Sequence, residues 1–233
     1  MTYSMKDSQR GVVGVSITAI IFIIATLASV KVHFENPFIP GFAISLTVQL
    51  LLTGITIAVM SKEVNYKINT PKGKTIIKPV LLALLATIVI NLVMTGITKL
   101  MGKPIETPAA LAKLKPLQVL IFVFFYASIA EEFLFRGFLL NYLTPLGKHG
   151  IQLFKRRISL PVIISAMAFG AAHLVVLTTG AGDMFVVRIV IFTTLLGAIA
   201  GYYQEKNDNH AYAIIVHMTG NSLAVIASLT MVS

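Results

Sequence analysis

The sequence predicts an all-α fold, a polytopic bundle of about seven transmembrane helices with an eighth possible. Three observations predict it. Hydrophobic residues make up 56% of the 233 residues and charged residues only 12%, about half the share found in ordinary soluble domains. Apolar runs of roughly 20 residues, the length that crosses a bilayer as a helix, recur along the chain. The connections between these runs are short and carry most of the charge.

Seven apolar runs are long enough to be membrane spans. They are Gly11–Val30, Phe38–Met60, Pro79–Ile97, Pro116–Leu143, Leu160–Leu177, Met184–Tyr203 and Ala211–Val232. The first exceeds the apolar core of a signal peptide, which has about 7–15 residues, so we expect a retained helix. The fourth is long enough to be tilted, or to contain a break that would raise the count to eight. We expect one membrane domain over residues 1–233, with a motif-bearing core over 116–232.

Basic residues are distributed unevenly between the two sides of the predicted bundle. The N-terminus and the connections after the second, fourth and sixth spans hold 12 of the 19 lysines and arginines. Because these residues favour the cytoplasmic side, we expect a multi-pass protein of the cell membrane with a cytoplasmic N-terminus. The net charge of +10 would suggest nucleic acid in a soluble protein. Between apolar runs it indicates anionic lipid head groups instead, so no nucleic-acid partner is expected.

Ionisable side chains inside the fourth span form the first candidate site. Each costs roughly 2.5–3.5 kcal/mol at the bilayer centre, so such residues are functional candidates. Glu132 and Arg136 are four residues apart, share a helix face and can pair. Glu131 is turned by about 100° from Glu132 and is the poorer partner for the arginine. A desolvated carboxylate beside another one suits a general acid or base; a structural charge cluster is the alternative interpretation.

Two later spans carry further polar pairs, each one helical turn apart. Phe169 and His173 share a face of the fifth span, although a lone histidine there is more often a packing residue. His217 and Asn221 share a face of the seventh span, where two donors can stabilise an oxyanion or tie neighbouring helices together. A rise of about 1.5 Å per residue lets Glu131 and both histidines meet between mid-bilayer and the cytoplasmic side.

Other polar and small residues rank lower as functional candidates. His33, His149 and His210 lie in connections or at span ends, where titration is cheap. Gly197 and Gly201 form a G-x-x-x-G pattern, which we interpret as internal packing rather than a dimer face. The chain has no cysteine, which excludes disulfides, thiolate metal ligands and a cysteine nucleophile.

Taken together, three motifs occur in order on the late spans: E-E-x-x-x-R, F-x-x-x-H and H-x-x-x-N. They consist of Glu131, Glu132, Arg136, Phe169, His173, His217 and Asn221. This set resembles the CPBP family of membrane proteins, the CAAX proteases and bacteriocin-processing proteins, also called the Abi family. The resemblance covers roughly residues 116–232, and the first three spans match only as generic hydrophobic helices.

The resemblance implies an intramembrane endopeptidase that acts on a peptide or protein substrate at the membrane. Glu131 and His173 would activate a water molecule, and His217 with Asn221 would form an oxyanion hole. The supporting residues would be Glu132, Arg136 and Phe169. No cofactor is expected, since the resemblance to prenyl-protein peptidases favours a glutamate mechanism without metal. Two histidines and a glutamate could still bind zinc, which is a minority interpretation.

The sequence leaves the substrate and the oligomeric state open. A prenylated C-terminus requires a host that prenylates proteins; in a bacterium a bacteriocin-like or signalling peptide precursor is more plausible. The alternative function is a non-enzymatic bacteriocin immunity or regulatory membrane protein of the same fold. An ion-coupled transporter ranks last, because the sequence shows neither inverted repeats nor interrupted helices.

Overall fold

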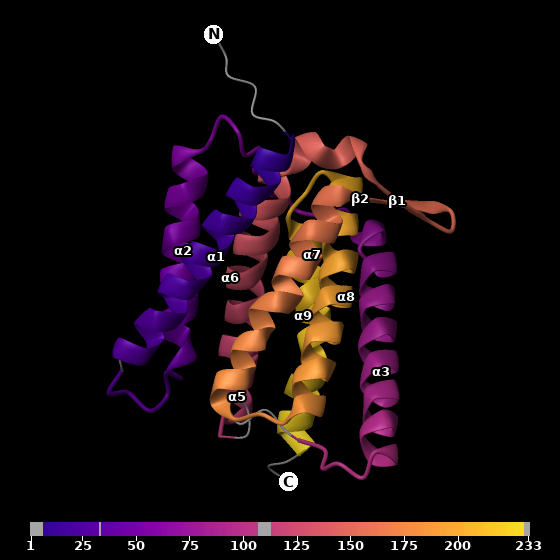
Figure 1. Cartoon of the computed structure of the whole chain (residues 1–233). Coiled ribbons are helices and arrows are strands. Elements are labelled where there is room, and N and C mark those ends of the chain that lie inside the picture. Colours follow the sequence, from indigo (N-terminus) through magenta and orange to yellow (C-terminus); the bar gives the residue numbers. More distant parts are fainter. Residues whose placement is uncertain (1–6, 33, 107–112, 231–233) are drawn as a thin grey trace.

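The computed structural model describes residues 7–32, 34–106 and 113–230 of the chain. Within these ranges, seven helices are long and apolar enough to cross a membrane (Figure 1). They are α1 (Asp7–Lys31), α2 (Phe42–Val59), α3 (Ile77–Leu100), the fourth span Pro116–Leu140, the fifth span Leu160–Thr179, α8 (Asp183–Asn207) and α9 (Ala211–Thr230). The predicted all-α membrane bundle and its seven spans are confirmed; residues 231 and 232, at the predicted end of the last span, lie outside the described ranges.

The fourth span is continuous but changes its helix type along its length. It consists of α5 (Pro116–Gln118), the π-helical segment η2 (Val119–Ala127), α6 (Ser128–Glu132) and the π-helical segment η3 (Phe133–Leu140). The break that would have raised the span count is therefore not found in this helix. π-helical turns are rare and frequently occur at functional sites. Here they flank the short α-helical stretch that carries both glutamates.

Successive helices run in opposite directions, so the two termini lie at opposite ends of the bundle (Figure 1), as an odd number of spans requires. The fifth span consists of α7 (Leu160–Ala172) and a 3₁₀ helix, η5 (His173–Thr179). Between spans four and five lies an antiparallel hairpin of β1 (Gly150–Leu153) and β2 (Arg156–Ser159). The sequence predicts this segment only as a charged connection.

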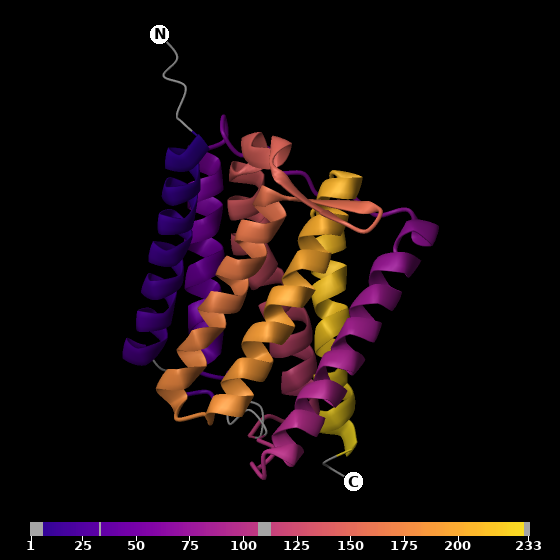
Figure 2. The ribbon, with the colours of Figure 1, turned by 45° about the vertical axis from the view of Figure 1, so that its right-hand side comes forward.

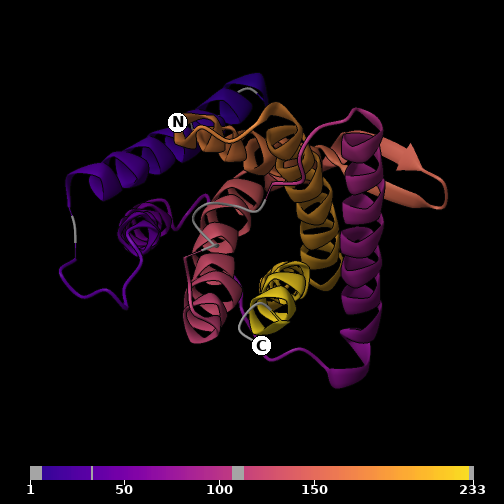
Figure 3. The ribbon, with the colours of Figure 1, turned by 90° about the horizontal axis from the view of Figure 1, so that it is seen from below.

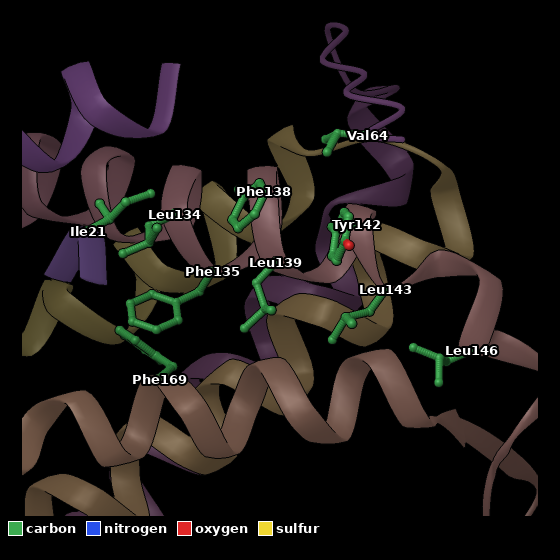
Figure 4. Close-up of a cluster of buried hydrophobic side chains, with 10 residues drawn as sticks. All are labelled: Ile21, Val64, Leu134, Phe135, Phe138, Leu139, Tyr142, Leu143, Leu146 and Phe169. Atoms are coloured by element: carbon green, nitrogen blue, oxygen red, sulfur yellow. The ribbon is translucent and has the colours of Figure 1, made fainter. Parts of the chain in front are cut away.

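The fourth span lies inside the bundle, where η3 contacts α1, α2, α7 and α8, and α6 contacts α9. Seen from the end that holds the C-terminus (Figure 3), α9 lies between the fourth span and the pair α3 and α8. The main apolar cluster surrounds η3 (Figure 4), with Phe135 facing Phe169 at 5.0 Å between ring centroids. A second cluster of mostly small residues joins α3, α8 and α9: Ala83, Leu196, Ala200, Ala213 and Val216.

The two glycines of the G-x-x-x-G pattern face the interior, as predicted. A Cβ at Gly197 would overlap Nη2 of Arg136, and a Cβ at Gly201 would lie 3.0 Å from Cδ1 of Leu140. Large apolar side chains cover the outside of the bundle, among them Val59 and Leu100, which are 79% and 90% exposed. An exterior of this kind suits lipid and not water.

Candidate active site

The centre of the candidate site is the buried ion pair of Glu132 and Arg136. Nη1 of Arg136 donates to Oε1 of Glu132 at 2.9 Å, and the two side chains are 1% and 0% exposed. The pairing predicted from the four-residue spacing is confirmed. Each charge of this pair neutralises the other in the apolar interior, so removal of either one leaves an uncompensated buried charge.

His217 brings α9 to this pair. Its Nδ1 donates to Oε1 of Glu132 at 2.8 Å, and its Nε2 lies 3.8 Å from Oε2 of Glu131. The imidazole ring therefore lies between the two carboxylates. The side chain of Glu131 is 22% exposed, whereas that of Glu132 is 1% exposed. Of the two, Glu131 is the more accessible to a substrate.

His173 lies at the point where α7 tightens into the 3₁₀ helix η5. Its Nδ1 lies 2.9 Å from the carbonyl oxygen of Phe169, and since a carbonyl only accepts, Nδ1 carries the proton. In the neutral ring Nε2 then keeps its lone pair free for an incoming proton. Within the described residues no hydrogen bond joins His173 directly to Glu131.

The ring of Phe169 holds the three motifs together. It is fully buried, and its centroid lies 4.9 Å from that of His173 and 5.3 Å from that of His217. The guanidinium carbon of Arg136 lies 4.6 Å from the same centroid, within the range of a cation–π contact. All three predicted motifs thus meet around one aromatic side chain.

Asn221 is engaged differently from its motif partner His217. Its Nδ2 donates to the carbonyl oxygen of Val123 and to Oγ of Ser128, both at 3.1 Å. An amide nitrogen has two protons, so both donors are occupied by the fourth span. The expected pair of donors aimed at one point is therefore divided: His217 turns to the glutamates and Asn221 to the backbone of η2.

Two further amides bind the backbone of the fourth span in the same way. Nε2 of Gln49 on α2 donates to the carbonyl oxygen of Ala130 at 2.9 Å. Nε2 of Gln204 on α8 donates to the carbonyl oxygen of Arg136 at 3.0 Å. Because a carbonyl oxygen has two lone pairs, it can accept these bonds in addition to its helical bond. The segment with the two glutamates is thereby held from two sides.

His210 contributes to the same network, and the interpretation that it titrates cheaply in a connection is wrong. It is 1% exposed, and its Nδ1 donates to Oε1 of Gln204 at 2.9 Å. Burial lowers its pKa from 6.5 to about 4; Glu132 opposes the shift and the charge of Arg136 adds to it. The ring is therefore neutral near pH 7.

The burial of His210 comes from the connection between α2 and α3. The backbone N–H of His210 donates to the carbonyl oxygen of Lys67 at 2.9 Å, and the ring of Tyr66 lies 5.3 Å from that of His210. Asn209 exchanges hydrogen bonds with the backbone of Asn69. No sequence signal indicates that this connection buries His210, since the contacting segments are about 140 residues apart.

A zinc ion, the minority interpretation, would need several His, Asp or Glu side chains arranged around one point. Among the described residues, no group of three or more His, Asp or Glu side chains is arranged to hold one. Oε1 of Glu132 already accepts from Arg136 and from His217. Oε2 of Glu132 is buried and has no hydrogen-bond partner among the described residues.

The fold and the site define a class of protein: a multi-pass membrane protein whose late helices enclose a buried glutamate, arginine and histidine cluster. Residues 113–223 match the family described as type II CAAX prenyl endopeptidase Rce1-like. The match confirms the resemblance that the three motifs predict, supports assignment to the CPBP, or CAAX protease, family, and with it supports an endopeptidase function. No curated protein and no solved structure matches the chain.

Proposed function

We propose that this protein is an intramembrane endopeptidase that hydrolyses a peptide bond of a membrane-associated protein or peptide with water activated by Glu131 and His173. The observation that carries the proposal is the convergence of three separate helices on one buried polar cluster. Glu131 is its partly exposed carboxylate, with Nε2 of His217 3.8 Å away. An accessible carboxylate with an imidazole within 4 Å suits general-base catalysis.

In the first step, a water molecule donates one hydrogen bond to Glu131 and the other to Nε2 of His173. The bond from Nδ1 of His173 to Phe169 holds the ring in the tautomer that can accept at Nε2. Glu131 takes a proton as the water oxygen forms a bond to the carbonyl carbon of the substrate. In the second step, the same proton passes to the leaving nitrogen, the C–N bond breaks, and Glu131 is again a carboxylate.

The negative charge that develops on the substrate oxygen is stabilised by His217 and Asn221. Nδ1 of His217 lies 2.8 Å from Glu132 and its Nε2 lies 3.8 Å from Glu131, so Nε2 faces the partly exposed side of the cluster and donates to the oxyanion when it carries a proton. Asn221 contributes when one of its two N–H groups leaves Ser128 or Val123 for the oxyanion. Hydrogen bonds of a catalytic site commonly rearrange in this way when substrate binds.

Glu132, Arg136 and Phe169 act as positioning residues in this proposal. Arg136 donates to Glu132, and Glu132 orients His217 through Nδ1. Phe169 packs against both histidine rings. None of the three needs to contact the scissile bond.

The substrate class that we propose is a peptide already held at the membrane, either by a prenyl group or by its own apolar segment. The end of the bundle with the N-terminus carries most of the lysines and arginines. We therefore place that end in the cytoplasm and expect the substrate to enter from that side.

The decisive experiment measures cleavage by the purified protein in liposomes, with mass spectrometry of one membrane peptide offered with and without a farnesyl group. Glu131→Ala and His173→Ala are each expected to lower turnover about 100-fold or more, the usual contribution of a general base. Exposed residues of the same types supply matched controls, Glu63→Ala and His149→Ala. Undiminished turnover in both site variants would refute the mechanism.

Two further experiments test a non-enzymatic role and a metal-dependent mechanism. A non-enzymatic immunity or regulatory role predicts that Glu131→Gln keeps the cellular phenotype, whereas a peptidase loses it. A metal mechanism predicts that a chelator abolishes turnover and that zinc restores it. The proposed glutamate mechanism predicts turnover that is unchanged by the chelator.

A further inference from the structure

An apolar groove of about 900 Å³ lies on the outside of the bundle, between α3, α7 and α8 and next to the β1–β2 hairpin. In Figure 2 the hairpin reaches from the top of the bundle toward the start of α3. The groove walls are mainly aliphatic, with Leu82 on α3, Met167 on α7 and Leu195 on α8. No residue of the proposed catalytic cluster lines it, so the groove is a separate feature of the molecule.

The groove is nearly as long as the hydrocarbon layer of one lipid leaflet is thick. Along α8 its lining runs from Tyr202, near the hairpin, to Thr194. Eight residues of α-helix rise about 12 Å, and half of the hydrocarbon core of a bilayer is about 15 Å thick. The groove thus runs from the membrane surface to about mid-bilayer, parallel to the helices. This is the course of a lipid acyl chain.

The hairpin supplies positive charge at the surface end of the groove. Arg156 pairs with Leu153 across the two strands and lines the groove, with its guanidinium carbon 5.6 Å from the ring centroid of Tyr202. Lys155, at the hairpin turn, lines it too. Within the described ranges no carboxylate forms an ion pair with either residue. Two cations thus lie beside an apolar channel without an acidic partner from the protein.

The two faces of the hairpin line different cavities. Ile151 and Ile158 are paired and line the groove, whereas Arg157 belongs to a polar cavity of about 350 Å³ on the other side. Glu205, the nearby acid, also lines that polar cavity and accepts from Oγ of Ser159 at 2.6 Å. Alternation of strand side chains therefore separates a face with apolar and cationic residues from a polar one.

We propose that the groove binds an anionic phospholipid, with the phosphate of its head group at Lys155 and Arg156 and one acyl chain along α3, α7 and α8. The charges select an anionic head group, and the aliphatic walls accept only a hydrocarbon chain. The ring of Phe154, 92% exposed at the hairpin turn, fits the same arrangement, because aromatic side chains favour the interface of a bilayer.

The test is native mass spectrometry of the purified protein with phosphatidylglycerol and phosphatidylcholine of identical acyl chains. Wild type is expected to retain phosphatidylglycerol preferentially. Lys155→Gln and Arg156→Gln are each expected to weaken its binding about fivefold, the usual effect of one basic residue near an anionic lipid. Arg157→Gln removes the same charge from the opposite face of the hairpin and is expected to leave binding unchanged. Glu131→Ala is expected to bind lipid as wild type does, which separates this proposal from the proposed function.

Filling the groove tests the position of the acyl chain. Ala198→Phe is expected to reduce binding of both lipids at least fivefold while the hairpin charges remain; if that variant does not fold, Ala86→Phe fills the α3 wall instead. Equal losses in Arg156→Gln and Arg157→Gln would overturn the proposal, because they indicate diffuse surface charge. Full lipid binding by the filled groove would also overturn it. So would displacement of phosphatidylglycerol by a farnesylated peptide whose binding depends on the groove.

Discussion

Acidification should destabilise this protein through His210, which is neutral in the folded state. The residue is buried in the connection between α8 and α9, donates from Nδ1 to Gln204, and faces the charges of Arg136 and Glu132. Its Nε2 has no hydrogen-bond partner among the described residues. A proton added at Nε2 would be a second buried cation next to Arg136.

The magnitude follows from the pKa of His210, about 4 in the folded protein against 6.5 for the exposed side chain. The unfolded chain binds the proton first, so the free energy of unfolding falls as the pH drops below 6.5 and levels off below about 4. Each pKa unit corresponds to about 1.4 kcal/mol, and the full loss is about 3 kcal/mol. Most of it falls between pH 6 and pH 4.

The assay compares thermal midpoints of the detergent-purified protein between pH 7 and pH 4.5, measured as the fraction that stays monodisperse after heating. His210→Gln keeps a hydrogen-bonding side chain and cannot gain a charge, so its midpoint should fall less steeply with pH than that of wild type. His149→Gln, whose side chain is 54% exposed, should follow wild type. All other titratable groups are the same in both proteins, so any difference in slope comes from His210. Parallel curves for wild type and His210→Gln would therefore refute the reasoning.

Three further predictions concern the site and its orientation. Gly197→Ala puts a Cβ onto Nη2 of Arg136 and should cost about 1–3 kcal/mol of stability together with peptidase turnover, whereas Gly201→Ala should cost less in both assays. Arg136→Leu leaves Glu132 buried without its partner and should destabilise by about 3–5 kcal/mol, measured as the thermal midpoint; an unchanged midpoint would contradict the buried pair. In this cysteine-free chain, Gln152→Cys on the hairpin should react with an impermeant maleimide only from the cytoplasmic side. Labelling from outside would show that the proposed orientation is wrong.

The spans were predictable because hydropathy is a local property of the sequence. The predicted starts of the fourth, fifth and seventh spans agree with the structure, and other ends differ by a few residues. The first helix, predicted over Gly11–Val30, extends from Asp7 to Lys31. Helices continue beyond their apolar run because charged ends can reach the polar interface. The hairpin was not predicted, since two strands of four residues give almost no periodicity.

Contacts along one helix were predictable and contacts between helices were not. Helical geometry alone brings Arg136 to Glu132 and His173 to the carbonyl of Phe169, four residues away in each case. The bond from His217 to Glu132 joins residues 85 positions apart, and its existence depends on how α9 packs against the fourth span. The catalytic roles of these side chains remain the proposal made above.

The hydrogen bonds to the fourth span indicate where the site can rearrange without losing its shape. Gln49 and Gln204 are each 3% exposed and bind the backbone on either side of Glu131. Replacing either glutamine by an apolar residue would remove a buried hydrogen bond to that backbone. Asn221 is only half-buried and shares its two protons between a backbone carbonyl and the hydroxyl of Ser128. A hydroxyl can rotate to another partner, and an interhelical bond of this kind contributes only about 0.6–2 kcal/mol. In the proposed mechanism, the Asn221–Ser128 bond is therefore the one that a substrate oxyanion would replace at small cost while the backbone around the glutamates stays fixed.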